Sequence, residues 1–196
     1  MTAGAAAPPD RATCTDAALI QLSLAESERF ATVFDRHAAE IYRYLAGRLG
    51  PDVADDVTAE TFLTAFRKRA QYDLDRADAR PWLYGIATRL ISDHRRTERR
   101  RARALARAPV AGPPEPFEDA TAERLTAERM IRALAGALGT LSAADRDLLL
   151  LVAWTDLTYG DIGQALGIAT GTVASRLHRI RKKILRNSPA SSRAPT

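Results

Sequence analysis

The sequence predicts an all-α protein of two small helical domains joined by a flexible linker, the second of them a helix-turn-helix domain. Aromatic residues make up only 6% of the 196 residues. Ala, Leu, Arg and Glu dominate the middle of the chain, which favours helices over sheet. Apolar residues recur at helical spacing through most of the sequence. Residues 108–121, rich in proline, glycine and acids, interrupt that spacing and mark the linker.

Composition also sets the expected domain boundaries. Residues 25–107 are expected to form the first helical domain and residues 122–187 the second. The Ala/Pro-rich leader, residues 1–24, and the tail, residues 188–196, are expected to be disordered. A formal net charge of +5 indicates a polyanionic partner.

The single cysteine, Cys14, gives neither a disulfide framework nor a thiolate metal site. No signal peptide and no apolar run of membrane-spanning length is found. We therefore expect a cytoplasmic protein without membrane insertion.

The first long helix is predicted at about residues 27–49, where Gly50-Pro51 ends it. His37 is expected at its surface or edge, because no second metal-binding side chain stands at helical spacing from it. The apolar positions of this helix are Phe30, Val33, Phe34, Ala38, Ile41, Leu45 and Leu49.

Asp52 is expected to cap the next helix, residues 53–72. Its apolar residues form no single stripe, so we expect it to contact both its own core and another molecule. The acids Asp55, Asp56 and Glu60 allow a carboxylate metal site or a general acid/base pair. Acids at a helix start already follow from the helix dipole, and a protein-docking face is the better functional interpretation.

Pro81 begins a third helix, residues 82–107, that buries its first half and then becomes basic. Trp82 and Tyr84 can stack on unpaired bases, although core packing is the alternative for Trp82. Eight arginines against two acids between residues 89 and 107 leave a charge of +6, which favours phosphate contacts. The arginines are Arg89, Arg95, Arg96, Arg99, Arg100, Arg101, Arg103 and Arg107, and the acids are Asp93 and Glu98.

The second domain is predicted to open with a helix at about residues 122–137. Ser142 and Asp145 then form a cap pair for a helix that is apolar nearly all round. So small a domain cannot bury every apolar side chain of that helix, and this indicates a contact with a partner.

Residues 158–186 predict a helix-turn-helix. Thr158 caps the first of two short helices, Gly167 ends it, and Thr170 begins the second. The buried face of the second helix carries Val173, Leu177, Ile180 and Ile184. Residues 170–196 hold seven positive charges and no acid, so the exposed face is expected to lie in the major groove of DNA.

Four segments, in this order and spacing, resemble a bacterial RNA polymerase sigma factor of the extracytoplasmic-function type. They are FDRHAAEIYRYLAGRLG, DVADDVTAETFLTAFRKR, PWLYGIATRLISDHRRTERRR, and LSAADRDLLLLVAW with the helix-turn-helix. The resemblance implies a transcription initiation factor that binds core RNA polymerase and promoter DNA, without catalytic residues, metal or cofactor. An inhibitory anti-sigma factor is a common partner in this family.

The family pattern also implies roles for residues. The surface that docks on the β′ clamp helices would carry Asp55, Asp56, Glu60 and Phe62. Recognition and melting of the downstream promoter element would involve Trp82, Tyr84, Arg89, Asp93, Arg95, Arg96, Arg99 and Arg100. The apolar helix of the second domain would contact the β flap. The upstream element would be bound by Thr172, Ser175, Arg176, His178, Arg179, Arg181 and Lys182.

Two other classes compete with this interpretation. A freestanding helix-turn-helix regulator would bind operators as a dimer and would need a dimerisation surface. A metal-dependent nucleic-acid enzyme would need a ligand set that the sequence does not offer. The acidic helix and the second arginine-rich helix argue against the freestanding regulator.

Overall fold

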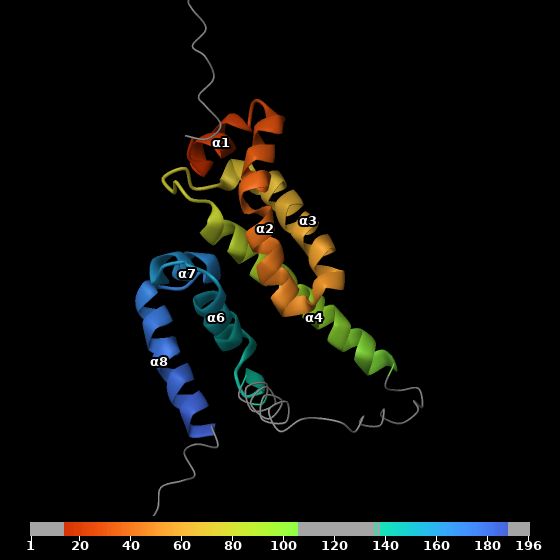
Figure 1. Cartoon of the computed structure of the whole chain (residues 1–196), viewed down its shortest axis with the longest axis vertical. Coiled ribbons are helices and arrows are strands. Elements are labelled where there is room, and N and C mark those ends of the chain that lie inside the picture. Colours follow the sequence, from red (N-terminus) through yellow and green to blue (C-terminus); the bar gives the residue numbers. More distant parts are fainter. Residues whose placement is uncertain (1–13, 106–135, 137, 188–196) are drawn as a thin grey trace, which may run out of the picture. The chain divides into compact units, whose positions relative to one another are not determined.

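The computed structural model describes residues 14–105, 136 and 138–187 (Figure 1). Every regular element in these ranges is a helix, as predicted. The elements are α1 (Asp16–Leu22), η1 (Ser27–Arg29), α2 (Phe30–Leu49), α3 (Pro51–Lys68), η2 (Arg69–Gln71), α4 (Arg80–Leu105), α6 (Ala143–Trp154), α7 (Tyr159–Leu166) and α8 (Thr170–Asn187). The predicted linker, the tail and nearly all of the predicted helix 122–137 lie outside the described residues. None of the helices in the described part has the length and hydropathy needed to cross a bilayer.

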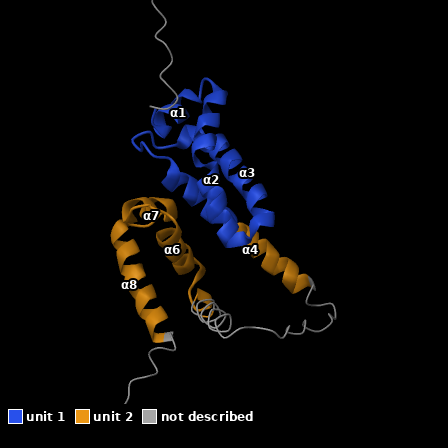
Figure 2. Ribbon diagram, viewed as in Figure 1, with its two compact units in different colours: residues 1–91 blue, residues 92–196 orange. Residues whose placement is uncertain are grey.

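The chain divides into two compact units, residues 1–91 and 92–196, and the division falls within α4 (Figure 2). The first unit holds α1, α2, α3 and the first half of α4. The second holds the remainder of α4 together with α6, α7 and α8.

Helix α1 corrects the expectation that the leader is disordered as far as residue 24. Thr15 caps it by accepting a hydrogen bond from the amide of Ala18. Leu19 and Ile20 are buried in the first unit, with 2% and 0% exposure. A helix this short is not stable by itself, so its order comes from tertiary contacts.

Helices α2 and α3 pack side by side along the first unit (Figure 1). Gly50, with φ of 87°, makes the reversal between them and stands at the N-cap of α3. Pro51 is the first helical residue, so Asp52 lies within the first turn and is not the cap that the sequence predicted. The shared core contains Val33, Ile41 and Leu45 of α2, all fully buried.

The second unit is built around α7 and α8, which both pack on α6. Ser142 caps α6 and accepts from the amide of Asp145, as predicted. Thr158 and Asp161 form a reciprocal capping box at the start of α7. Gly167 ends α7 in the left-handed conformation, with φ of 66°. The core of the unit includes Leu148, Leu151, Ile162, Val173, Leu177 and Ile180.

Gly163 of α7 lies against the backbone of the turn that follows, and its replacement by alanine should destabilise the second unit. A Cβ at Gly163 would lie 2.7 Å from the backbone carbonyl oxygen of Ile168. Overpacking of this kind costs about 1 to 3 kcal/mol. Thermal unfolding of G163A, with hydrogen exchange of the α7 and α8 amides, measures the loss. G171A is the matched control, since a Cβ at Gly171 meets nothing within 4 Å, and an equal loss in both variants would contradict the steric explanation.

Candidate nucleic-acid interface and docking surfaces

The helix-turn-helix brings most of its predicted DNA-binding residues to one exposed face of α8. Ser175, His178, Arg179 and Lys182 follow one another at helical spacing and all are exposed. Arg181 is exposed beside them, whereas Thr172 and Arg176 are half-buried. Val173, Leu177 and Ile180 are buried, as predicted, and Ile184 is half-buried. Because α8 packs on α6 and α7, its free face is the polar and basic one.

The last turns of α8 carry two further residues that are not among the predicted DNA contacts, Lys183 and Leu185. The ammonium group of Lys183 donates a hydrogen bond to the carbonyl oxygen of Thr140, which ties α8 to the turn before α6. Leu185 is 68% exposed. Together with neighbouring cations it lines a shallow groove whose other residues are His178, Arg181, Lys182 and Arg186.

The second half of α4 is a cationic surface. After Ile91 none of the described side chains of α4 is buried. Arg96 and Asp93 form an ion pair of 3.0 Å, and exposed pairs of this kind contribute little. The predicted residues Arg89, Asp93, Arg96, Arg99 and Arg100 are all exposed, and Arg95 is half-buried.

The two aromatic residues at the start of α4 occupy different environments. Trp82 is half-buried, and its ring lies 5.0 Å from that of Tyr72. Tyr84 is 3% exposed and packs edge-on against Tyr44, with ring centroids 5.2 Å apart. Tyr84 is therefore a core residue, which corrects the prediction that it stacks on bases.

The acidic residues of α3 form the predicted exposed surface, but the apolar residue predicted to lie on it, Phe62, does not. Asp55, Asp56 and Glu60 are exposed. Phe62 is only 4% exposed, because its ring packs against Phe34 at 4.8 Å. Phe34 at 43% exposure and Leu63 at 47% supply the apolar surface instead. Periodicity places both phenylalanines near the α2–α3 contact but does not tell which of them is covered.

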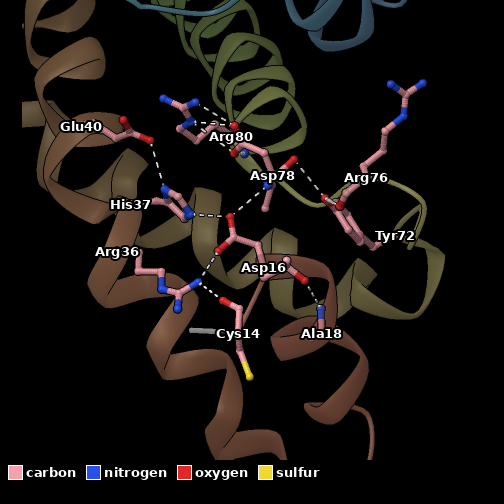
Figure 3. Close-up of polar contacts among 12 residues, drawn as sticks. Cys14, Asp16, Ala18, Arg36, His37, Glu40, Tyr72, Arg76, Asp78 and Arg80 are labelled. Carbon is pink, nitrogen blue, oxygen red and sulfur yellow. Dashed lines mark hydrogen bonds and ion pairs between the residues drawn. The ribbon is translucent and has the colours of Figure 1, made fainter. Parts of the chain in front are cut away.

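A buried polar cluster in the first unit was not foreseen (Figure 3). His37, predicted at the surface, is only 9% exposed. Its Nε2 lies 2.7 Å from Oδ2 of Asp16, and its Nδ1 lies 3.1 Å from Oε1 of Glu40. Arg36 donates from Nη1 to Oδ1 of Asp16 at 2.9 Å. Asp16 lies 20 positions from Arg36 and 21 from His37, so no local pattern in the sequence predicts that it joins them.

The charges in this cluster reinforce one another. Burial by itself would lower the pKa of His37, but hydrogen bonds to Asp16 and Glu40 outweigh it and raise that pKa to about 9. Burial would raise the pKa of Asp16, but the hydrogen bonds from His37, Ala79 and Arg36 lower it to about 2. Ligand atoms of Asp16, His37 and Asp78 lie within 4.8 Å of one another, as in a metal site. Each of these three side chains already has an ion-pair partner: Asp16 pairs with Arg36 and His37, and Asp78 pairs with Arg80 at 2.8 Å, so we interpret the cluster as structural.

Alkaline pH should weaken the folded protein through His37. A pKa raised from 6.5 to about 9 contributes stability that is complete below pH 6.5 and is lost as the pH rises through 9. The full shift corresponds to a loss on the order of 3 kcal/mol. H37Q should flatten the dependence of the melting temperature on pH between 6.5 and 9. H178Q, at an exposed position, should keep the wild-type dependence, and an unchanged slope in H37Q would contradict the assignment.

Sequence comparison assigns both units to known families. Residues 33–101 match Sigma-70 region 2, and residues 131–184 match Sigma-70, region 4. The ECF RNA polymerase sigma factor SigL of Mycobacterium tuberculosis is 35% identical over 156 residues, which cover 79% of this chain and 85% of that protein. SigC of the same species is 31% identical over 146 residues, covering 74% of this chain and 76% of that protein.

Solved structures share the fold. CnrH in complex with the cytosolic domain of CnrY matches with a TM-score of 0.59 and 21% identity, covering 87% of this chain and 95% of that one. The sigma factor RpoE in complex with the anti-sigma factor NepR from Bartonella quintana matches with a TM-score of 0.57 and 18% identity, covering 82% and 96%. The sequence matches to both sigma regions and to SigL therefore show that this chain belongs to the extracytoplasmic-function family of RNA polymerase sigma factors.

Proposed function

We propose that this chain, as a sigma factor that binds core RNA polymerase and directs it to promoters, divides that work among α3, α4 and α8. The observation that carries the proposal is the separation of charge among them. One helix exposes acids beside apolar side chains, and two others expose rows of cations. Acids suit a protein partner here, because they would repel DNA phosphates.

Helix α3 docks on core polymerase, through the β′ clamp helices. Asp55, Asp56 and Glu60 supply electrostatic complementarity, and Phe34 and Leu63 supply exposed apolar area beside them. An apolar patch with a charged rim is the usual composition of a protein interface. This version of the docking surface replaces Phe62 with Phe34 and Leu63.

Helix α4 holds and opens the downstream promoter element. Its exposed arginines neutralise phosphates, which gives affinity without sequence information. Trp82, half-buried at the start of the helix, is positioned to stack on a base once the duplex opens.

Helix α8 lies in the major groove of the upstream element. Ser175, His178 and Arg179 reach base edges, and Thr172, Arg176, Arg181 and Lys182 contact phosphates. Each good base contact contributes about 1 to 3 kcal/mol of discrimination.

Helix α6 anchors the second unit on the β flap. Its residue Trp154 is 48% exposed, and Leu149, Leu150 and Val152 are half-buried. We also propose a first domain that includes α1 and ends near residue 107, a second domain at residues 122–187, a cytoplasmic location, and an anti-sigma factor as a further partner.

Reconstitution of the full chain with core polymerase tests the proposal. The holoenzyme should transcribe from a defined subset of genomic promoters, and core polymerase alone should not. Footprinting of the free chain should show no symmetric protection of paired half-sites. A free chain that protects such half-sites as a dimer and does not bind polymerase would instead support the freestanding regulator.

A further inference from the structure

Helix α1 is joined to the segment that leads into α4 through one buried carboxylate (Figure 3). The backbone amide of Asp16 donates to the carbonyl oxygen of Ala77 at 3.0 Å, and Oδ2 of Asp16 accepts from the amide of Ala79 at 3.0 Å. Arg36 and His37 of α2 hold the same carboxylate from its other side. Asp16 is only 6% exposed. We call Asp16, Arg36 and His37, with residues 73–79, the Asp16 clamp.

Tyr72, a buried residue, contacts the same segment, residues 73–79. Its single hydroxyl proton is shared between the carbonyl oxygens of Arg76, at 2.7 Å, and Asp78, at 3.1 Å. Its ring packs against Trp82. The carboxylate of Asp78 accepts from the amide of Arg80, the first residue of α4, at 2.9 Å. The segment is therefore fixed at Ala77 and Ala79 by Asp16 and at Arg76 and Asp78 by Tyr72, up to the start of α4.

Stability alone is a weak reason for this arrangement. A buried ion pair costs desolvation, and well-packed apolar residues often stabilise a fold as much or more. What a fully hydrogen-bonded buried carboxylate does supply is one defined arrangement of the groups around it. Here those groups are the backbone amides and carbonyls that precede Trp82. The clamp's Asp16 also lies outside residues 33–101, the part of the chain that matches sigma region 2.

We propose that Asp16 is a positioning residue for promoter opening, because the Asp16 clamp and Tyr72 hold Trp82 and the first turn of α4 in place. This inference rests on the proposed role of α4 in opening the downstream element. Asp16 itself is buried away from any DNA. Stacking on an extruded base requires the aromatic ring to be in place when the base leaves the duplex, so a loosened segment slows opening and spares initial binding.

Two substitutions loosen the segment from opposite sides. D16N leaves one side-chain acceptor oxygen where Arg36, His37 and the Ala79 amide now share two. Y72F removes the hydroxyl and keeps the ring that contacts Trp82. S23A, at the C-cap of α1, is the matched control: its hydroxyl donates to the carbonyl oxygen of Ile20 at 2.6 Å and is fully buried, and it forms no hydrogen bond with residues 73–79.

The experiment uses holoenzyme reconstituted from the full chain and measures permanganate reactivity of unpaired thymines at a target promoter. D16N and Y72F should open the promoter about tenfold less, which corresponds to roughly 1.4 kcal/mol. Polymerase binding and closed-complex affinity should stay at wild-type levels. A template with a pre-opened bubble should restore transcription in both variants, which a protein that is merely less stable would not show.

Opening by D16N and Y72F at the wild-type level would overturn the inference. So would a loss in S23A that matches theirs at an equal decrease in melting temperature. A different result would contradict the proposed function itself: a wild-type holoenzyme that opens no promoter, or promoter opening that does not change when the α4 arginines are replaced.

Discussion

Replacement of Asp56 and Glu60 together by lysine is expected to abolish co-purification with core RNA polymerase. Both side chains are exposed on α3, one helical turn apart, beside the apolar surface of Phe34 and Leu63. Like charges that face each other across an interface cost several kcal/mol. We therefore expect binding to weaken by at least ~100-fold, or roughly 2.7 kcal/mol.

The folded first unit should tolerate this change. Both positions lie beyond the first turn of α3, where the helix dipole has little influence. The two residues already carry like charges four positions apart, so two lysines exchange one repulsion for another of similar size. An unchanged melting temperature and circular dichroism spectrum would show that lost binding is a surface effect.

The control for this experiment reverses the same amount of charge elsewhere on the first unit. E28K/D75K alters two exposed acids outside α3 and should leave polymerase binding intact. Affinity for promoter DNA fragments should not decrease in either double variant. Co-purification of D56K/E60K at the wild-type level would remove α3 from the docking surface.

The features that the sequence predicted well are those that depend on near neighbours. The capping box of Thr158 and Asp161, the left-handed Gly167 and the buried stripe of α8 all follow from residues within a few positions of one another. Such local signals placed the helix-turn-helix and its exposed basic face with little ambiguity.

The features that the sequence missed depend on distant partners. Helix α1 is ordered because Asp16 binds residues 20 and more positions away, and composition alone made that region look like part of the leader. His37 looked like an edge residue for the same reason. Phe62 and Phe34 both fit an apolar pattern, and only the packing of α2 on α3 decides which ring stays exposed.

Neutralisation of the cationic face of α4 should weaken promoter binding and make the remaining affinity less dependent on salt concentration. Arg96, Arg99, Arg100 and Arg103 are exposed and share one helical face. Each phosphate contact contributes about 0.7 to 0.9 to the slope of log affinity against log salt concentration. Replacement of all four by glutamine should therefore reduce the slope by roughly 3. Glutamine is a good helix former, so α4 should remain intact.

The measurement is the affinity of reconstituted holoenzyme for one promoter fragment over a range of salt concentrations. The control removes four cations from α2, α3 and η1 of the first unit, as R29Q/R43Q/R67Q/K68Q, and should leave the slope nearly unchanged. If the control lowers the slope as much as the α4 variant does, the effect reports overall charge and α4 is not a phosphate-binding surface.

The same titration separates the two basic helices. Loss of a phosphate contact weakens binding to all sequences alike, whereas loss of a base contact relaxes discrimination at one position. The α4 variant should therefore keep its preference for the cognate upstream element over a scrambled one. R179A on α8 should lose part of that preference, by about 1 to 3 kcal/mol, and lose at most one phosphate contact from the slope. This difference follows from where the structure places the charges. The four replaced arginines of α4 lie among residues 92–104, where no side chain is buried, and Arg179 lies on a helix that is held by its apolar face in a helix-turn-helix.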